Sequence, residues 1–321
     1  MRILPYPHGV PHQIRSASGY LSEIQKFSEE NRKAGFFGVL LFASLGDPLD
    51  QWDLAHQVAG ATGQVPLVAV FPFWEHPVLT ARKIASFQAI HDREIAINWL
   101  TGISVRDQEK IGLELSKEDR YARLSEYIEI VTALLDPTQT KIYSFAGKYF
   151  QVNRHNLTFT STHKVHHFVS GSSQGCVDLV KKFPFLNQIT AGREMTFDYG
   201  PTVSGVGLGF VVRETAEEAK AFYLEKMSPT PKSLVYSRLA EQNTDSEWKQ
   251  DLFKLGKSGQ DLGNFYPGAL DGYSELGFFV GDYRQGAEYF RNLKSQGIDT
   301  VLASLLNSGE VQHLKKAVDL V

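Results

Sequence analysis

A glycine and two serines stand between an apolar segment and a predicted helix, and this arrangement is typical of a phosphate site. They are Gly171, Ser172 and Ser173, at the end of the segment VHHFVSGSS. At the start of a helix, free backbone N–H groups and the positive end of the dipole attract anions, and the two hydroxyls add donors. The alternative is that Ser172 only caps the helix.

A second group of polar residues ends the apolar segment EIAINWL, residues 94–100. Alternate residues of a strand share a face, so one face of this segment is bulky and ends in Trp99, whereas the other carries Ala96 and Asn98. A small residue followed by a polar one near the carboxyl end of a strand suits a ligand bound above a barrel. Asn98 and Thr101 are therefore candidate ligand contacts. The alternative is that Asn98 is a buried residue that caps its own strand.

Four further side chains could take part in chemistry, and each has a structural alternative. His8 follows the first predicted strand, and histidine titrates near neutrality, so it is the candidate general acid or base; otherwise it is a surface loop histidine. Phe73 and Trp74 follow the third predicted strand, where they could stack on a ligand ring or pack in the core. Arg193 could pair with a phosphate or an anionic substrate, or remain solvated.

The composition is that of an ordinary globular protein, with 42% hydrophobic and 21% charged residues among 321. A formal net charge of -3 gives no electrostatic reason to expect nucleic acid or a membrane as partner. The single cysteine, Cys176, excludes an intrachain disulfide, and His166 and His167 would point in opposite directions on a strand, so we expect no metal site. The first residues, MRILPYPHGV, hold no long apolar run, so we expect no signal peptide, and without any run of roughly 18 apolar residues we expect a cytoplasmic protein.

Apolar and amphipathic segments alternate along the chain, with units of about thirty residues as in βαβ structures. Parallel strands with crossover helices follow, and we expect one (β/α)8 TIM barrel domain over residues 1–321. A doubly wound open sheet is the main competitor, but the number of units is high for one, and no GxGxxG follows the first strand. The expected strands include residues 2–6, 36–43, 65–71, 94–100, 165–171, 205–214, 276–282 and 298–305.

Two segments depart from this regular pattern. Residues 191–205 contain Gly200 and Pro201 and show no helical period, so we expect the sixth unit to lack a full outer helix. Residues 227–275 form an insertion after the seventh strand, with two helical pieces that should lie near the active face. Either this insertion or a second subunit should cover the apolar surface that the missing helix exposes, which favours a homodimer.

The ordered set of motifs resembles the bacterial luciferase-like flavin monooxygenases, and in particular their alkanesulfonate monooxygenase branch. The stretch HPVLTARKIASFQAIHDREIAINWLTG carries three features of that pattern: a helix after a proline, the pair Ala81-Arg82, and a strand ending in N-x-x-T-G. The pair Arg120-Tyr121 then opens the next helix. The segments KAGFFGVLLF, FAGKYFQV, FVSGSSQGCVDLV and VVRETAEEA also agree, so the resemblance covers nearly the whole chain.

The resemblance implies a barrel that binds reduced FMN, supplied by a separate flavin reductase, and oxygenates an organic substrate that is either free or tethered to a carrier. It implies that Tyr121 contacts the FMN phosphate through its hydroxyl, and that Asn98 and Thr101 contact the flavin ring. His8, with the glycine that follows it, matches an H-G pair of the same branch. Two alternatives remain: a flavin-binding barrel that has lost catalysis, and an oxidoreductase that uses the deazaflavin F420.

The chain departs from the alkanesulfonate branch at several positions that hold the sulfonate. Gly207 and Gly209 stand where that branch carries Arg-x-His, and residues 268–277 lack its loop arginine. Because a small sulfonate needs cationic partners, we do not expect it as substrate. The two glycines should open space at the floor of the site for a bulkier group or for a displaced flavin.

Overall fold

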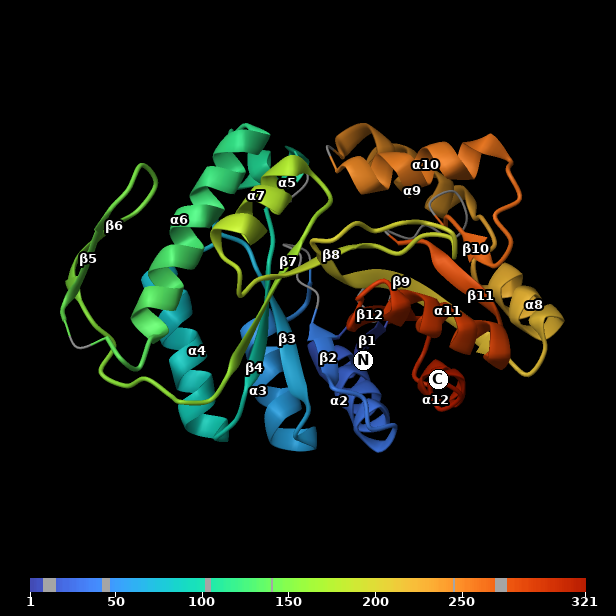
Figure 1. Ribbon diagram of the computed structural model, residues 1–321, viewed down its shortest axis with the longest axis horizontal. Helices are drawn as coiled ribbons and strands as arrows, with labels where there is room; N and C mark the ends of the chain where they lie inside the picture. Colours follow the sequence, from blue (N-terminus) through green and yellow to red (C-terminus); the bar gives the residue numbers. More distant parts are fainter. Residues whose placement is uncertain (8–15, 42–46, 102–104, 140, 245, 269–275) are drawn as a thin grey trace.

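Eight apolar segments form the parallel strands of a nearly closed barrel (Figure 1). The computed structural model describes residues 1–7, 16–41, 47–101, 105–139, 141–244, 246–268 and 276–321, with the backbone alone for residues 105–107. Neighbouring strands are hydrogen-bonded in the order β1-β12-β9-β8-β7-β4-β3-β2, and the Phe37 N–H donates to the Ile3 carbonyl (3.1 Å) beside the remaining seam. The expected (β/α)8 class is confirmed. The barrel strands are β1 (Arg2–Pro7), β2 (Gly38–Leu41), β3 (Val65–Val70), β4 (Ile95–Trp99), β7 (Val165–Ser170), β8 (Asn187–Ala191), β9 (Val203–Arg213) and β12 (Thr300–Leu305).

Helices cover the outside of the barrel, and local sequence signals set several of their ends. His76 accepts the Val78 N–H (3.3 Å) ahead of Pro77, and proline suits the first turn of a helix. Gly63 ends another helix with φ 69°, a left-handed conformation that glycine adopts without strain. The helices are α2 (Ala17–Lys33), α3 (Gln51–Thr62), α4 (Pro77–His91), α5 (Val105–Lys110), α6 (Lys117–Leu135), α7 (Gln174–Lys182), α8 (Ala216–Lys226), α11 (Tyr283–Ser295) and α12 (Glu310–Val318).

Residues on the two faces of β4 belong to different parts of the core, as the alternation along this strand predicted. Ile95, Ile97 and Trp99 are fully buried in the large cluster between the strands and the outer helices. Ala96 belongs to a separate cluster that fills the barrel interior, together with Leu4, Leu40, Leu67, Phe168, Ile189 and Leu302 from six other strands. Asn98 lies on the same face of β4 as Ala96, so its side chain points to the interior at the carboxyl end.

The sixth unit lacks its outer helix, as the sequence predicted. Between β8 and β9 the segment 192–202 forms turns and irregular chain. Two side chains of α11 and that of its C-cap residue hold it: Tyr289 Oη donates to the Arg193 carbonyl (2.8 Å), and Asn292 and the C-cap Gln296 donate to further carbonyls of the segment. The helix α11, the neighbouring helix of the ring, therefore packs on this segment, and the insertion also reaches it, since Arg193 lies 3.9 Å from Asp251 of the insertion. Cover by a second subunit stays a prediction.

The insertion after β9 contains the two expected helices, α9 (Pro231–Asn243) and α10 (Glu247–Ser258), followed by the short strand β10 (Phe265–Tyr266). They lie beside the end of the barrel that carries α5 and α7 (Figure 1), and Lys117 Nζ at the start of α6 donates to Glu247 Oε1 (2.6 Å). The expected strand at 276–282 exists as β11 (Phe278–Asp282), but it pairs with the second half of β9 and lies outside the ring of eight.

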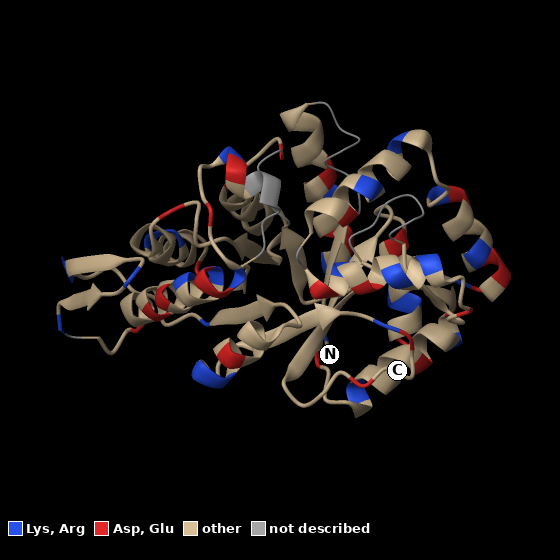
Figure 2. Ribbon diagram, turned by 90° about the horizontal axis from the view of Figure 1, so that it is seen from above, with Lys and Arg blue, Asp and Glu red and all other residues tan. Residues whose placement is uncertain are grey.

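A hairpin of β5 (Tyr143–Ala146) and β6 (Gln151–His155) projects beside α6 (Figure 1). Positive and negative side chains are interspersed over the helices and do not gather on one face (Figure 2). Among the residues that the structure describes, no helix is both long and apolar enough to cross a membrane.

Candidate active site at the carboxyl end of the barrel

The carboxyl end of β7 meets the first turns of α6 and α7, and the polar residues singled out in the sequence come together there. Tyr121, in the second turn of α6, places its Oη 2.7 Å from Ser173 Oγ. Two glycines of the loop and of α7 leave the space that the Tyr121 side chain occupies. A Cβ added to Gly171 would lie 3.1 Å from Tyr121 Oη, and one added to Gly175 would lie 2.6 Å from the ring. Tyr121 therefore lies directly against the glycine-serine loop.

Ser173, and not Ser172, is the N-cap residue of α7. Its side chain makes no capping hydrogen bond and is paired with Tyr121 instead, although it is only 8% exposed. A serine hydroxyl has one donor and two acceptor positions, so this pair retains capacity for a further partner at the positive end of the helix. The alternative that Ser172 caps the helix is thus wrong, and the structure places Ser172 exposed in the same loop.

The environment of Tyr121 keeps its phenol protonated. Burial raises the pKa of Tyr121, and hydrogen bonds to Ser173 and Thr101 oppose this rise only in part. The protonated hydroxyl is available as a donor at neutral pH. Thr101, which is 8% exposed, is thereby joined to the same group as Tyr121 and Ser173.

Asn98 lies one strand away from this loop, at the floor of the barrel mouth. Its Oδ1 accepts a hydrogen bond from Ser170 Oγ on β7 (2.9 Å), and the residue is 5% exposed. This bond fixes the orientation of the amide. The sequence reasoning missed Ser170, which directly precedes the glycine-serine motif. It could have been found by strand alternation, because it lies two residues beyond Phe168, the register partner of Asn98.

An apolar wall adjoins Asn98, since Ala69 of β3 is its register partner. Phe71 and Trp74 pack with ring centroids 4.4 Å apart. Phe73 and Leu100 pack on the same small cluster, which is separate from the main core. The structure thus places Phe73 and Trp74 together in a wall beside the mouth.

The predicted space at Gly207 and Gly209 is absent, because side chains from the segment before β11 and from β11 itself fill it. A Cβ on Gly207 would meet Leu276 at 3.4 Å, and one on Gly209 would overlap the ring of Phe278. The parallel pairing of β9 with β11 places Phe278 beside Gly209. The glycines therefore admit apolar side chains of the chain itself.

Arg193 is engaged by carboxylates. Its guanidinium lies 3.5 Å from Glu194 and 3.9 Å from Asp251 of α10, and its charge stacks over Phe197 at 4.8 Å. With two carboxylates nearby, Arg193 is not a free cation for an anionic substrate, so the structure does not favour that interpretation.

The remaining candidates lie elsewhere. His8 and most of the loop 268–277 fall outside the described residues. His166 bonds to Glu94, and His167 stacks on Trp99 with centroids 5.8 Å apart. Within the described part of the chain, no three His, Cys, Asp or Glu side chains are grouped so that they could hold a metal ion.

The donor set at the glycine-serine loop fits a phosphate monoester. It consists of two hydroxyls and a helix N-terminus, and the two glycines let Tyr121 approach closely. Hydroxyl and backbone donors of this kind bind phosphate without a metal. A phosphate-bearing flavin is therefore compatible with the residues present.

Comparison with known proteins gives two matches at the level of sequence. A sequence model described as "Luciferase-like monooxygenase" matches residues 6–180. The 4-(gamma-L-glutamylamino)butanoyl-[BtrI acyl-carrier protein] monooxygenase BtrO of Niallia circulans is 25% identical over 320 residues, covering 94% of this chain and 91% of the relative.

Two solved structures share the fold. The EDTA monooxygenase of Chelativorans sp. BNC1 superposes with a TM-score of 0.73 at 16% identity, over 99% of this chain and 92% of the other. An F420-dependent secondary alcohol dehydrogenase gives a TM-score of 0.68 at 12% identity, over 100% and 98%. At these identities the likeness shows the fold alone.

Proposed function

Because the chain belongs to the luciferase-like monooxygenase family, it is an oxidoreductase of the monooxygenase type, and we propose that it uses reduced FMN and O2 to oxygenate an organic substrate. The observation that carries the choice of FMN is the hydroxyl pair of Tyr121 and Ser173 at the N-terminus of α7. A flavin that lacks a phosphate would leave these donors without a charged partner.

Each group at the barrel mouth has a defined task in this proposal. Tyr121 and the loop from Gly171 to Ser173 bind the phosphate, whereas Asn98 and Thr101 contact the flavin ring. Reduced flavin, when bound, supplies the reaction with O2, whereas the protein holds the flavin and the substrate in position and excludes water. The apolar wall described above excludes water beside the ring. His8 remains the candidate for moving a proton.

We propose that the substrate is an acyl group carried on a carrier protein. The support is the relative whose name specifies such a substrate, with which this chain aligns over 94% of its length. Leu276 and Phe278 occupy the space that a small sulfonate would require, and neither side chain carries a charge that could hold it. An acyl chain of mixed polarity suits a floor of this kind better than a sulfonate does.

One experiment separates this function from its two alternatives. Purified protein is mixed with reduced FMN and O2, and the absorbance of the flavin is followed. Reoxidation that differs from that of free reduced FMN supports a monooxygenase. Bound flavin with unchanged reoxidation indicates that catalysis has been lost, and preferential binding of F420 indicates a hydride-transferring oxidoreductase.

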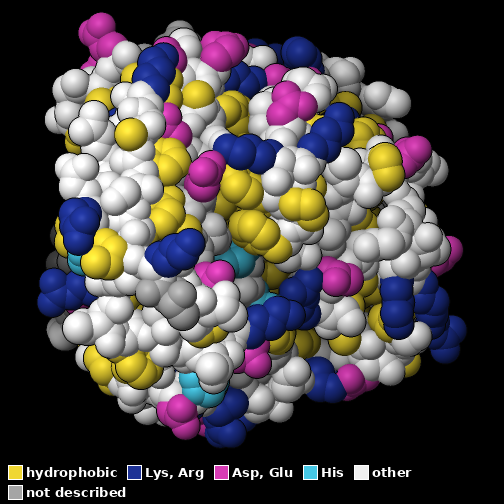
Figure 3. Space-filling model, turned by 60° about the vertical axis from the view of Figure 1, so that its left-hand side comes forward, with side chains coloured by type: hydrophobic (Ala, Val, Ile, Leu, Met, Phe, Trp, Pro, Cys, Tyr) yellow, Lys and Arg dark blue, Asp and Glu magenta, His cyan; other side chains and the backbone are white. Residues whose placement is uncertain are grey.

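We further propose two partners, a flavin reductase that supplies reduced FMN and a second copy of the chain. Leu79 and Ile90 on α4 are 47% and 67% exposed. They are eleven positions apart, which is about three helical turns, so they lie on one face of the helix. Figure 3 brings the side of α4 and α6 forward, where apolar side chains show between charged ones over a broad area. Sedimentation of the protein and of Leu79→Glu tests the dimer.

A further inference from the structure

The helix α9 presents its large apolar side chains to solvent. Leu234, Val235, Tyr236 and Leu239 are between 40% and 55% exposed, whereas Ser237, which lies opposite Val235 and Leu239 on the helix, is 2% exposed. A surface helix of a globular protein normally has the reverse arrangement, with its apolar face toward the core. An exposed apolar face of this kind marks a surface that another molecule covers.

Small side chains form the stripe of α9 that faces the protein. Ser237 and Ala240 lie toward the body of the molecule, and Ala240 packs against the main core. The start of the helix is fixed by a capping box, in which Thr230 Oγ1 accepts the Ser233 N–H (3.0 Å) and Ser233 Oγ accepts the Thr230 N–H (2.8 Å). Because Ser237 and Ala240 face the body of the molecule, the larger apolar side chains of α9 point to solvent.

Cations flank this face. Lys232 and Arg238 are exposed on α9, and neither forms an ion pair within the described parts of the chain. Glu241, which also lies on α9, is already paired with Lys257 of α10 (2.5 Å). The exposed face of α9 is thus apolar and positive, in a chain whose formal net charge is -3.

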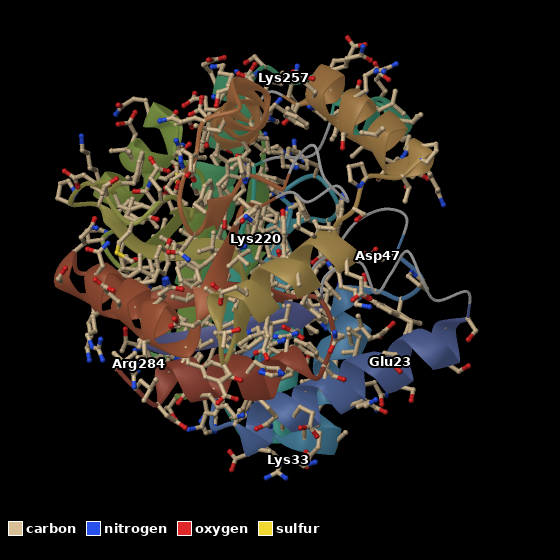
Figure 4. All side chains as sticks on the ribbon, turned by 90° about the vertical axis from the view of Figure 1, so that its right-hand side faces the viewer. Glu23, Lys33, Asp47, Lys220, Lys257 and Arg284 are labelled. Carbon is tan, nitrogen blue, oxygen red and sulfur yellow. The ribbon has the colours of Figure 1, made fainter. Side chains whose placement is uncertain are left out.

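The position of α9 connects this face with the barrel mouth. The bond between Lys117 and Glu247 ties the insertion to the first turn of α6, four residues before Tyr121. Figure 4 shows α9 and α10 at the end of the molecule that carries Lys257, away from Arg284. A partner seated on α9 would stand next to the entrance of the proposed flavin site.

We propose that α9 is the docking site of the carrier protein that delivers the acyl substrate, an inference that rests on the function proposed above. An acidic helix of the carrier pairs with Lys232 and Arg238, and its apolar residues cover Val235 and Leu239. Helix-on-helix docking with apolar anchors and complementary charge is a common recognition mode, in which charge sets the rate of encounter and the partner selected. The flexible arm of the carrier then reaches the mouth.

Fluorescence anisotropy with an acidic, phosphopantetheine-bearing holo-carrier protein, labelled at its N-terminus, tests the docking site in flavin-free protein. The variants are Lys232→Glu with Arg238→Glu, and Val235→Ser with Leu239→Ser. Each pair should weaken binding at least about tenfold, and added salt should weaken binding by wild type. Arg284→Glu reverses one charge in the same way at a remote exposed position and should leave the affinity unchanged.

Wild type that binds the holo-carrier no more tightly than these variants would overturn the proposal. So would variants that convert an oligomer to monomers while the affinity for the carrier stays constant, because α9 would then be covered by a second copy of the chain. Titration of every variant with FMN keeps the two proposals apart. Normal FMN binding with lost carrier binding is the expected result, whereas failure of FMN binding in wild type would count against the flavin site alone.

Discussion

The hydroxyls of Tyr121 and Ser173 lie 2.7 Å apart, although the residues are separated by 52 positions in the chain. One is in the second turn of α6 and the other caps α7, so two crossover helices of the barrel meet through this pair. The contact depends on Gly171 and Gly175, because side chains at either position would meet the tyrosine. The pair places two hydroxyls beside the N-terminus of α7, where the sequence predicted a phosphate site.

Substitution of Gly175 should weaken FMN binding, because the added side chain would displace Tyr121. A Cβ there would lie 2.6 Å from the Tyr121 ring, so we expect Gly175→Ala to displace the ring and to lower the affinity for FMN about tenfold or more. Gly60→Ala in α3 is the matched control, since the nearest heavy atom to the added Cβ would be 3.8 Å away, on His91 of α4, and alanine favours helix. Equal FMN affinity of Gly175→Ala and wild type would contradict the placement of Tyr121.

The β5–β6 hairpin should depend on one carboxylate of α6. Glu126 accepts the backbone N–H groups of Lys148 (2.8 Å), Tyr149 (2.9 Å) and Phe150 (3.1 Å). Because Glu126→Gln removes the charge from these bonds, it should destabilise the hairpin by about 1–3 kcal/mol. Limited proteolysis should then cut near the hairpin faster, while the exposed Glu118→Gln behaves as wild type. Unchanged cleavage would show that the hairpin is held by other contacts.

Stability should fall in mild acid through His167. Burial, with a smaller effect of His166, lowers the pKa of His167 to about 4, and Trp99 Nε1 donates to its unprotonated Nδ1 (3.3 Å). The unfolded chain, with a histidine pKa of about 6.5, binds the proton first, so protonation favours unfolding as the pH falls from about 6.5 to about 4. The contribution lost is at most about 3 kcal/mol.

Urea unfolding at pH 7 and pH 5 measures this effect. His167→Gln should be less stable than wild type at pH 7 and should lose less stability between the two pH values. An equal pH dependence in wild type and His167→Gln would remove His167 as its cause.

Small alkanesulfonates should not be desulfonated. At the positions where the alkanesulfonate branch holds the sulfonate charge, this chain has Gly207 and Gly209, with Leu276 and Phe278 packed against them. Arg193 is engaged by carboxylates and is not free to replace the missing cations. Sulfite release is measured with a working flavin reductase and an alkanesulfonate. Turnover at an enzymatic rate would show that another cation holds the sulfonate.

The barrel and the shortened sixth unit could be predicted because both follow from local patterns. Continuous apolar runs mark strands buried on two faces, and Gly200 with Pro201 excludes a helix between β8 and β9. The inward orientation of Asn98 follows from strand alternation alone. Each of these features is decided by residues that are close in the sequence.

Features that depend on distant residues could not be predicted in the same way. The cover of the segment 192–202 comes from α11, about a hundred positions further along. Leu276 and Phe278 fill the space at the β9 glycines only because β11 pairs with β9 in one register. The sequence shows two glycines, and the identity of the side chains that pack on them depends on a pairing between strands.

The most direct test of the central claim compares reduced FMN with reduced riboflavin in anaerobic titrations of wild type, Tyr121→Phe and Ser173→Ala. The two ligands differ in the phosphate, so binding at the glycine-serine loop predicts that wild type prefers FMN. A charge-assisted hydrogen bond contributes about 1.5–3 kcal/mol, and each variant should therefore lose roughly ten- to a hundredfold in FMN affinity while riboflavin affinity stays constant. Tyr143→Phe in the hairpin should match wild type. Equal affinity of wild type for FMN and riboflavin, or FMN affinity unchanged in both variants, would contradict the site.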